Sequence, residues 1–245
     1  SRRRGPPAGS PAARWPRRHA GRSVLIGAIG HGNFYHWMFD VLPRIGLVAR
    51  SEFGSIDRWL VARSKLSVSQ ELLARCGIDP STVVEIGRGG HIECDELVVT
   101  SAPGAICEPT PASAEFVRTA LGRPGALCAA DPGRRIYVAR KGRRKVLNEN
   151  ALQPVLARAG FEMIAMEGMP LDAQIDAIAG ASVIVAPHGA ALAHLVHAAR
   201  GATLVELFPS DYINASFYAL AGACGIRYAA LLGQPNTGKT TLFNR

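Results

Sequence analysis

Apolar runs alternate with amphipathic stretches along most of the chain, and this alternation is typical of parallel βαβ units. In the first half the pattern predicts strands at 24–29, 58–61, 82–86 and 96–100, and helices at 34–49, 68–76 and 111–121. In the second half it predicts strands at 135–139, 161–166, 182–186, 203–208 and 227–231, and helices at 150–159, 171–179, 190–198 and 215–223. Strands separated by helices of this length predict an α/β fold with two Rossmann-like, doubly wound domains facing a cleft.

Local composition divides the chain into five segments. Residues 1–23 are rich in Arg, Pro and Gly, and we interpret them as a disordered basic tail. Residues 24–123 are expected to form the N-terminal domain and residues 134–232 the C-terminal domain. The segment 124–133 is rich in Pro, Gly and Ala and is the candidate linker between them. Residues 233–245 form a separate tail.

The net charge of +9 would favour a nucleic-acid partner, but this charge is unevenly distributed. Seven arginines and no acid fall within the first 23 residues, whereas the rest of the chain carries 21 basic and 19 acidic groups. The excess charge therefore belongs to the tail, and we expect no nucleic-acid partner for the folded part. A short basic tail also attracts anionic lipid, so peripheral contact with a membrane is the alternative to a solvated leader.

The five cysteines are scattered and form no C-x-x-C pair, which argues against a disulfide framework or a thiolate zinc site. This usage fits a reducing compartment. No apolar run approaches the roughly 20 residues of a membrane span, and the given sequence contains no signal peptide. We therefore expect a cytoplasmic protein, with peripheral membrane contact as the alternative.

Residues 31–44 combine polar residues at helical spacing with an apolar face. His36, Asp40 and Arg44 are each four residues apart, so a helix places them on one stripe. Asn33 is a suitable N-cap for this helix. The opposite face suits a core because it carries Trp37, Met38, Val41 and Leu42. We interpret the stripe as one wall of an active-site cleft. The alternatives are a solvated surface, or an imidazole bonded to the carboxylate for structure alone.

In the second half, candidate phosphate-binding groups follow strands, at the sheet edge where open α/β folds bind ligands. Arg140 and Lys141 follow the strand at 135–139. A Pro-His-Gly turn follows the strand at 182–186 and opens a helix whose free N–H groups favour a phosphate: His188, Gly189, Ala190, Ala191 and Leu192. Glu206 lies near the end of the next strand, where it is placed to accept hydrogen bonds from a ribose. Together these residues indicate a nucleotide-diphosphate pocket, although each alone also fits an ordinary loop, turn or strand end.

Several separate motifs follow one another along the chain: the segment 31–44, Arg135-Ile-Tyr-Val-Ala-Arg-Lys, Val146-Leu-Asn-Glu, Gly160-Phe-Glu, Gln174, Ala186-Pro-His-Gly-Ala-Ala-Leu and Val205-Glu-Leu-Phe-Pro. With these motifs, residues 24–232 resemble glycosyltransferase family 61, whose bacterial members are often capsular polysaccharide biosynthesis proteins. The resemblance implies a GT-B fold and an inverting, metal-independent sugar transfer without a cofactor. The expected donor is a UDP-linked sugar, and the expected acceptor is a hydroxyl of a glycan or lipid-linked glycan.

The resemblance also assigns roles to residues. Arg140 and the helix start at 189–192 fall on the donor-phosphate site, and Glu206 falls near the nucleoside. The acceptor side receives His31, Asn33, His36, Asp40 and Arg44. Two positions depart from the family's pattern and bear on the identity of the donor: Ala139, where Ser is common, and His194, where Asn is common.

A displacement at the anomeric carbon needs a base for the incoming hydroxyl and charge stabilisation for the departing diphosphate. Asp40 or His36 is the candidate base. Arg140, Lys141 and the helix N-terminus would stabilise the leaving group in place of a metal. This mechanism requires His36 and Arg140 to face one shared groove.

Two further patterns are set aside. His188, His194 and His197 cluster within ten residues, but no metalloenzyme His–Glu motif accompanies them, so we expect no metal. Gly233-Gln-Pro-Asn-Thr-Gly-Lys-Thr matches the P-loop pattern and resembles the first motif of translation-factor-class GTPases. Because the chain stops soon afterwards, we expect this tail to be non-functional.

The alternatives to a transferase are a non-catalytic nucleotide- or glycan-binding module of the same fold and, less favoured, a P-loop GTPase fragment.

Overall fold

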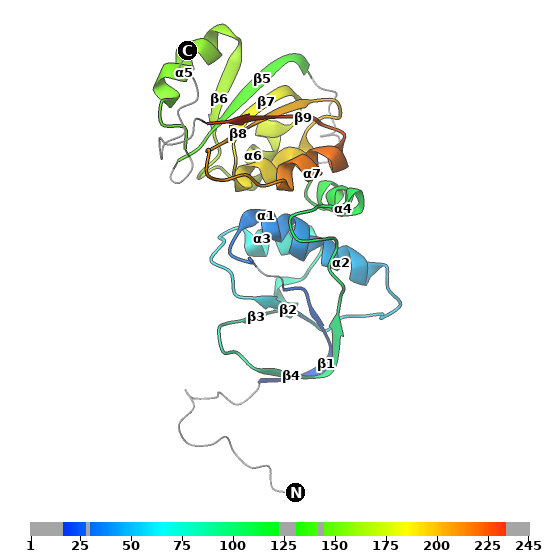
Figure 1. Cartoon of the computed structure of the whole chain (residues 1–245). Helices are drawn as coiled ribbons and strands as arrows, with labels where there is room; N and C mark the ends of the chain where they lie inside the picture. Colours follow the sequence, from blue (N-terminus) through cyan, green and yellow to red (C-terminus); the bar gives the residue numbers. More distant parts are fainter. Residues whose placement is uncertain (1–16, 28–29, 123–130, 142–144, 234–245) are drawn as a thin grey trace, which may run out of the picture.

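The computed structural model describes residues 17–27, 30–122, 131–141 and 145–233, which form two β-sheets with helices packed between them (Figure 1). The N-terminal sheet has the strand order β3-β2-β1-β4, and the C-terminal sheet has the order β6-β5-β7-β8-β9. Every strand pair in both sheets is parallel. The predicted α/β architecture with parallel sheets is therefore confirmed.

The order of elements follows the predicted alternation of strands and helices. The N-terminal half contains β1 (Arg17–Leu25), α1 (Phe34–His36), the π-helical η1 (Trp37–Val41), α2 (Leu42–Ala49), β2 (Arg58–Ala62), α3 (Ser69–Arg75), η2 (Pro80–Thr82), β3 (Val83–Ile86), β4 (Ile92–Val99) and α4 (Pro111–Leu121). The C-terminal half contains β5 (Asp131–Ala139), α5 (Glu149–Arg158), β6 (Phe161–Ala165), α6 (Leu171–Ile178), β7 (Ala181–Pro187), the 3₁₀-helix η3 (Ala190–His197), β8 (Thr203–Phe208), α7 (Ser216–Cys224) and β9 (Arg227–Leu232). The bounds of α4 and β8 coincide with those predicted.

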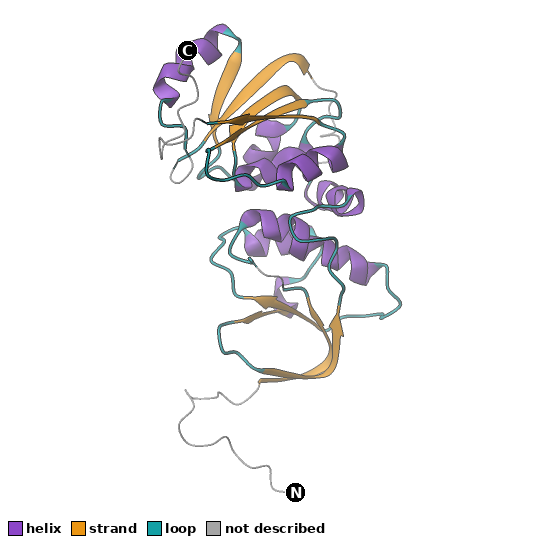
Figure 2. Ribbon diagram, viewed as in Figure 1, coloured by secondary structure: helices purple, strands orange, loops and turns teal. Residues whose placement is uncertain are grey.

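Helices from the two halves pack against each other between the sheets (Figure 2), and one apolar cluster contains buried residues from both halves. The ring of Tyr35 in α1 lies 5.4 Å from that of Phe217 in α7, and Arg118 of α4 donates from Nε to the carbonyl of Val196 at 2.8 Å. None of the described helices is both long and apolar enough to cross a bilayer.

The first strand begins within the segment that was expected to be disordered. Residues 17–23 belong to β1, so that expectation is wrong for them, while residues 1–16 lie outside the described residues. Two of the arginines of β1 pair with acids of β4: Arg18 pairs with Asp95 at 3.3 Å and Arg22 with Glu96 at 2.9 Å. Local composition missed these partners because they lie more than 70 residues away along the chain.

The predicted linker overlaps the C-terminal sheet. Residues 124–130 lie outside the described residues, but residues 131–133 begin β5, so this part of the linker prediction is wrong. The start of the strand is irregular, because the register with β7 shifts between Asp131 and Arg135. Asp131 accepts the N–H of Gly133 at 2.8 Å. A bulged strand entry of this kind tolerates Pro and Gly, which is why the composition resembled a linker.

The helix predicted over 34–49 is interrupted by a π-helical turn. The N–H of Leu42 bonds to the carbonyl of Trp37, five residues earlier. Pro43 follows directly and has no N–H to donate, so a regular α-helical ladder cannot continue through it. The extra residue of the turn is absorbed just before the proline, and such π turns are frequent at functional sites.

The helix predicted over 190–198 is 3₁₀ rather than α-helical, and it carries two buried imidazoles. Its side chains from Leu192 to His197 are all buried, so tertiary packing decides its geometry. Burial lowers the pKa of His194 to about 3, with the charge of His197 as a second cause. Burial, followed by the charges of Arg118 and Arg75, lowers the pKa of His197 to about 4. Both imidazoles are therefore neutral in the folded protein at pH 7.

We expect these two histidines to make the fold sensitive to acid. Below pH 6.5 the imidazoles of His194 and His197 bind protons in the unfolded state but stay neutral in the folded state. The free energy of unfolding therefore falls as the pH drops towards 4. The slope is about 1.4 kcal/mol per pH unit for each imidazole. Urea unfolding of the wild type and of His194→Asn between pH 7.5 and 4.5 measures it, and the variant should show a shallower fall.

The exposed His91 supplies the matched control, because His91→Asn removes an imidazole without removing a buried one. Its stability should follow the wild-type curve. Identical slopes in all three proteins would show that the buried imidazoles do not cause the acid sensitivity.

Candidate functional site

A cavity of about 380 Å³ lies where the strand order of the C-terminal sheet reverses, between β5 and β7. Open α/β sheets bind ligands at this switch point, beyond the carboxyl ends of the strands. The C-terminal half lines the cavity with residues that follow β5, β6 and β7, among them Arg140, Lys141, Glu167 and Gly189. The N-terminal half contributes Phe34 and residues 66–68. We call this space cavity 1.

Arg140 occupies a seat that depends on Gly189. Its Nη1 donates a hydrogen bond of 2.6 Å to the carbonyl oxygen of His188. A Cβ atom on Gly189 would lie 1.5 Å from that Nη1 and 2.7 Å from the Cζ atom. The backbone of Gly189 is extended, with φ at 172°, so glycine is required here for space and not for its dihedral angles. Arg140 and Gly189, which were both predicted to bind the donor phosphate, therefore lie next to each other in the structure.

The start of η3 adds hydrogen-bond donors to the wall of cavity 1. The first helical bond runs from the N–H of Leu192 to the carbonyl of Gly189 at 2.9 Å, so the N–H groups of Ala190 and Ala191 precede the ladder. The backbone N–H of Lys141 donates to Glu167 at 2.8 Å. Cations, helix-start N–H groups and one carboxylate thus meet at one sheet edge, an arrangement that suits an anionic ligand. Sequence reasoning missed Glu167, although it follows β6 as Arg140 follows β5.

His188 and Glu206 lie behind this wall and do not line cavity 1. Nδ1 of His188 is 2.6 Å from Oε1 of Glu206, and the hydroxyl of Tyr228 donates to Oε2 at 2.7 Å. Glu206 has no exposed surface, and both of its carboxylate oxygens are engaged. The expected contact of Glu206 with a ribose does not fit this arrangement. Position alone placed the carboxylate at the strand end, but neighbouring side chains turn it into the core.

A second cavity, of about 650 Å³, lies at the corresponding switch point of the N-terminal sheet, between β1 and β4. We call it cavity 2. It is lined by apolar residues that follow β1, β2 and β4, and by four of the predicted polar residues: His31, His36, Asp40 and Arg44. The stripe predicted from helical spacing therefore does border a cavity.

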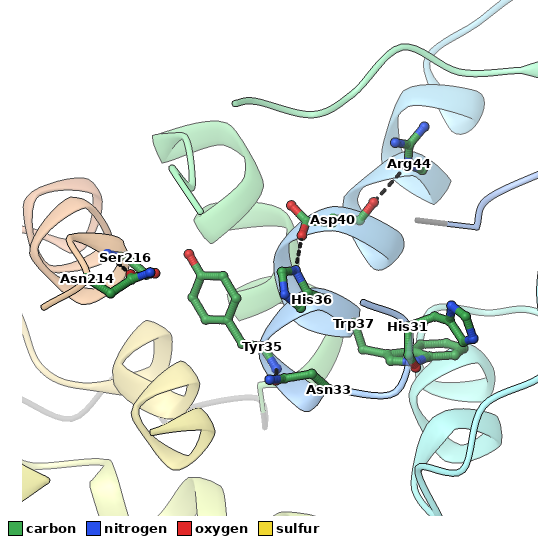
Figure 3. Close-up of polar contacts among 9 residues, drawn as sticks. All are labelled: His31, Asn33, Tyr35, His36, Trp37, Asp40, Arg44, Asn214 and Ser216. Atoms are coloured by element: carbon green, nitrogen blue, oxygen red, sulfur yellow. Dashed lines mark hydrogen bonds and ion pairs between the residues drawn. The ribbon is translucent and has the colours of Figure 1, made fainter. Parts of the chain in front are cut away.

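His36 and Asp40 form a close pair in cavity 2 (Figure 3), with Nδ1 of the imidazole 2.5 Å from Oδ2 of the carboxylate. Both side chains are about one-fifth exposed. Gly30 allows the imidazole its place, because a Cβ there would lie 2.5 Å from Cδ2 of His36. Its φ of +84° also favours glycine. Sequence reasoning missed Gly30, which lies four residues before the start of the predicted helix at Phe34.

The other residues predicted on the acceptor side make hydrogen bonds that involve backbone groups. Arg44 donates from Nε to the carbonyl of Asp40 at 2.8 Å and from Nη1 to the carbonyl of Thr100 at 3.0 Å, so it ties η1 to the end of β4. Burial lowers the pKa of Arg44. Asn33 caps α1, as predicted, by accepting the N–H of Tyr35 at 2.9 Å, and it lines neither cavity. The carbonyl of His31 accepts the indole N–H of Trp37 at 2.6 Å.

His36 and Arg140 line different cavities, so the structure does not bring them together in the one groove that was expected. Helix α1 lies between them: Phe34 lines cavity 1, while His36 lines cavity 2. Tyr35 lies on a third side of α1 and points towards α7 (Figure 3). Sequence spacing placed the polar stripe correctly within its own helix, but it could not place that helix against the other half.

Within the described residues, no group of three or more His, Cys, Asp or Glu side chains is arranged to hold a metal ion. The predicted P-loop segment lies outside the described residues from position 234 onwards.

A cationic cavity and an imidazole–carboxylate cavity, each at the switch point of a parallel sheet, define an α/β protein with two candidate ligand sites. Comparison with protein-family models adds the family: residues 34–205 match Glycosyltransferase 61. This stretch is more than half of the chain and includes Arg140, Gly189 and the His36–Asp40 pair. The chain therefore belongs to glycosyltransferase family 61 and is a glycosyltransferase by family. No curated protein matches it.

Proposed function

We propose that the protein is an inverting, metal-independent glycosyltransferase with a GT-B arrangement. It would transfer a sugar from a nucleotide donor, expected to be UDP-linked, to a hydroxyl of a glycan or lipid-linked glycan. The product would enter a surface or capsular polysaccharide. The observation that carries the proposal is the seat of Arg140 against Gly189 at the switch point of the C-terminal sheet.

Cavity 1 supplies what a nucleotide diphosphate needs. The guanidinium of Arg140 and the ammonium of Lys141 lie at the same sheet edge as the free N–H groups that open η3. These groups would balance the charge that grows on the diphosphate as the sugar leaves. Fixed donors of this kind would take the place of a bound metal ion in the proposed reaction.

The His36–Asp40 pair is the proposed base for the incoming hydroxyl. Either the carboxylate accepts that proton directly, or it orients the imidazole through Nδ1–H so that Nε2 accepts the proton. This reaction requires cavities 1 and 2 to open into one groove when substrates are bound, since Arg140 and His36 line different cavities on either side of α1 in this structure.

One observation favours the second candidate, a non-catalytic nucleotide- or glycan-binding module. Because cavities 1 and 2 are lined separately, each is able to bind a ligand without bringing the two ligands together. This candidate shares the donor site with the transferase and differs in lacking turnover. Release of nucleoside diphosphate in the presence of an acceptor separates the two.

A cytoplasmic location, with peripheral contact to anionic lipid, remains part of the proposal. Arg18 and Arg22 of β1 were counted with the basic tail, but they are paired with acids of β4. The lipid contact therefore depends on the arginines that precede the strand: Arg2, Arg3, Arg4 and Arg14.

A thermal-shift panel of UDP-, GDP-, CDP- and dTDP-linked sugars, each with and without EDTA, tests the donor site. A ligand at about 100 times its Kd stabilises the native state by about 2.7 kcal/mol. For a chain of this size that corresponds to a rise in Tm of about 5–10 °C. We expect one nucleotide class to give this rise with EDTA present, and Arg140→Ala to remove it.

The matched control is Arg135→Ala. Arg135 lies in β5, the strand that Arg140 follows, but it bonds to the carbonyl of Ala159, away from cavity 1, so its variant should keep the rise. The proposal fails if no nucleotide sugar shifts the Tm of the wild type, or if the shift survives in Arg140→Ala.

A further inference from the structure

Glu206 is a fully buried carboxylate that no step of the proposed reaction uses. It lies within β8, with Oε1 2.6 Å from Nδ1 of His188 and Oε2 2.7 Å from the hydroxyl of Tyr228 in β9. Burial, together with the Glu206 carboxylate, raises the pKa of Tyr228, so the phenol stays protonated and donates. A buried carboxylate is costly unless its oxygens are satisfied, and here both are.

His188 is held to β8 at two points. Its ring bonds to Glu206, and its backbone N–H donates to the carbonyl of Leu207 at 2.9 Å. The ring also stacks on Phe208, with centroids 5.2 Å apart and an interplanar angle of 28°. The ring centroids of Tyr212 and Phe217 also lie 5.2 Å from that of His188, so contacts with β8 and with these two rings orient the imidazole.

On its other side, His188 contacts Arg140. The carbonyl of His188 accepts the hydrogen bond of 2.6 Å from Nη1 of Arg140. Contacts therefore run from Tyr228 in β9, through Glu206 in β8 and His188 at the end of β7, to the arginine that follows β5. This path crosses the sheet behind the wall of cavity 1.

We propose that Glu206 and Tyr228 are positioning residues, which hold His188 and through its carbonyl fix the guanidinium of Arg140 for the donor diphosphate. The donor part of this inference depends on the proposed function, whereas the effect on Arg140 does not. Neither positioning residue lines cavity 1, and the hydrogen bonds described here connect them to Arg140 through His188.

The chemistry of the carboxylate predicts a spectroscopic signature. A carboxylate only accepts, so Nδ1 of His188 carries the proton in the wild type. In Glu206→Gln, an amide whose oxygen still accepts from Tyr228 turns its NH₂ towards Nδ1, so the imidazole accepts there and carries its proton on Nε2. The flipped amide, whose NH₂ donates to the Tyr228 oxygen, would instead leave the proton on Nδ1. The ¹⁵N shifts of the His188 ring report this exchange, which a merely space-filling role of Glu206 would not predict.

The binding test uses uridine diphosphate, measured by calorimetry on the full chain. We expect Glu206→Gln to weaken its binding about tenfold, because the charged hydrogen bond that supports His188 is replaced by a weaker neutral one. Tyr228→Phe should weaken binding about threefold, because it leaves one oxygen of Glu206 buried without its donor. The Nε–H resonance of Arg140 should shift in both variants.

The chain contains a matched pair for control. The hydroxyl of Tyr137 donates to Glu149 at 2.8 Å within the same half of the protein, but neither residue touches His188 or lines cavity 1. Tyr137→Phe and Glu149→Gln should change binding less than twofold and leave the Arg140 resonance in place.

Unchanged binding and an unmoved Arg140 resonance in Glu206→Gln would overturn the inference, even if the imidazole proton had moved. If Glu206→Gln does not fold, Tyr228→Phe decides by the same two readouts. If the wild type binds no uridine diphosphate, the UDP assignment of the proposed function fails. The Arg140 resonance then still supports or overturns the positioning role.

Discussion

Gly189→Ala is expected to weaken nucleotide-sugar binding about 100-fold while leaving the fold intact. A methyl group at this position would lie 1.5 Å from Nη1 of Arg140, so the guanidinium must leave its seat. It would lose the carbonyl of His188 and its place beside cavity 1. Each hydrogen bond to a charged group contributes about 1.5–3 kcal/mol, and losing the arginine's contacts to a diphosphate corresponds to about two orders of magnitude in Kd.

Stability should change little, because the displaced atoms are the far end of a flexible side chain. Calorimetric titration with the nucleotide sugar that gives the largest thermal shift measures Kd, and thermal unfolding without ligand measures stability. If the two residues act as one unit, Gly189→Ala should have no further effect on binding in an Arg140→Ala background.

Gly222→Ala is the matched control. Gly222 lies in α7, and no atom comes within 4 Å of a Cβ placed there. Alanine should keep donor binding and raise stability by up to about 1 kcal/mol, because glycine is disfavoured inside a helix. Wild-type Kd in Gly189→Ala, or additive losses in the double variant, would contradict the seat described for Arg140.

Sequence patterns were sufficient where local physics decides the outcome. The apolar run over 203–208 predicted β8, and an amphipathic period with a favourable first turn predicted α4. Helical spacing brought Nδ1 of His36 within 2.5 Å of Oδ2 of Asp40, although Asp40 lies in the π turn. The rule that ligands bind beyond strand ends located cavity 1, whereas the helical spacing of residues 31–44 located one wall of cavity 2.

Sequence patterns failed where a partner far along the chain decides the outcome. The arginines of β1 resembled a disordered tail until Asp95 and Glu96 were brought beside them by the parallel pairing of β1 with β4. Glu206 ends a strand in the sequence, but Tyr228 and His188 turn it inward.

Whether the two sites share a groove is likewise decided by long-range packing. Whether Phe34 or His36 faces the other half depends on how α1 packs against η3 and α7, and helical period alone carries no such information. The structure shows the ring of Phe34 at 4.9 Å from that of His194 in η3, with His36 on the other cavity.

Asp40→Asn is expected to lower kcat by about 10²–10⁴ without weakening donor binding. Asparagine keeps the size of the side chain but removes the carboxylate that pairs with His36, and general-base assistance is typically worth this factor. Donor affinity should be unchanged, because Asp40 lines cavity 2 while Arg140 lines cavity 1. The measurement is single-turnover transfer with saturating donor, alongside a calorimetric Kd for the donor.

His36→Gln tests the second half of the pair, and Asp95→Asn serves as control because its carboxylate pairs with Arg18 in β1 and lines neither cavity. If the imidazole is the base, His36→Gln should slow transfer at least as much as Asp40→Asn, since the carboxylate then acts only by orienting it. If the carboxylate is the base, His36→Gln should retain more activity than Asp40→Asn. Transfer at the wild-type rate in both variants would remove the pair from the mechanism, and the base would have to be sought in cavity 1, where Glu167 is the carboxylate among the described lining residues.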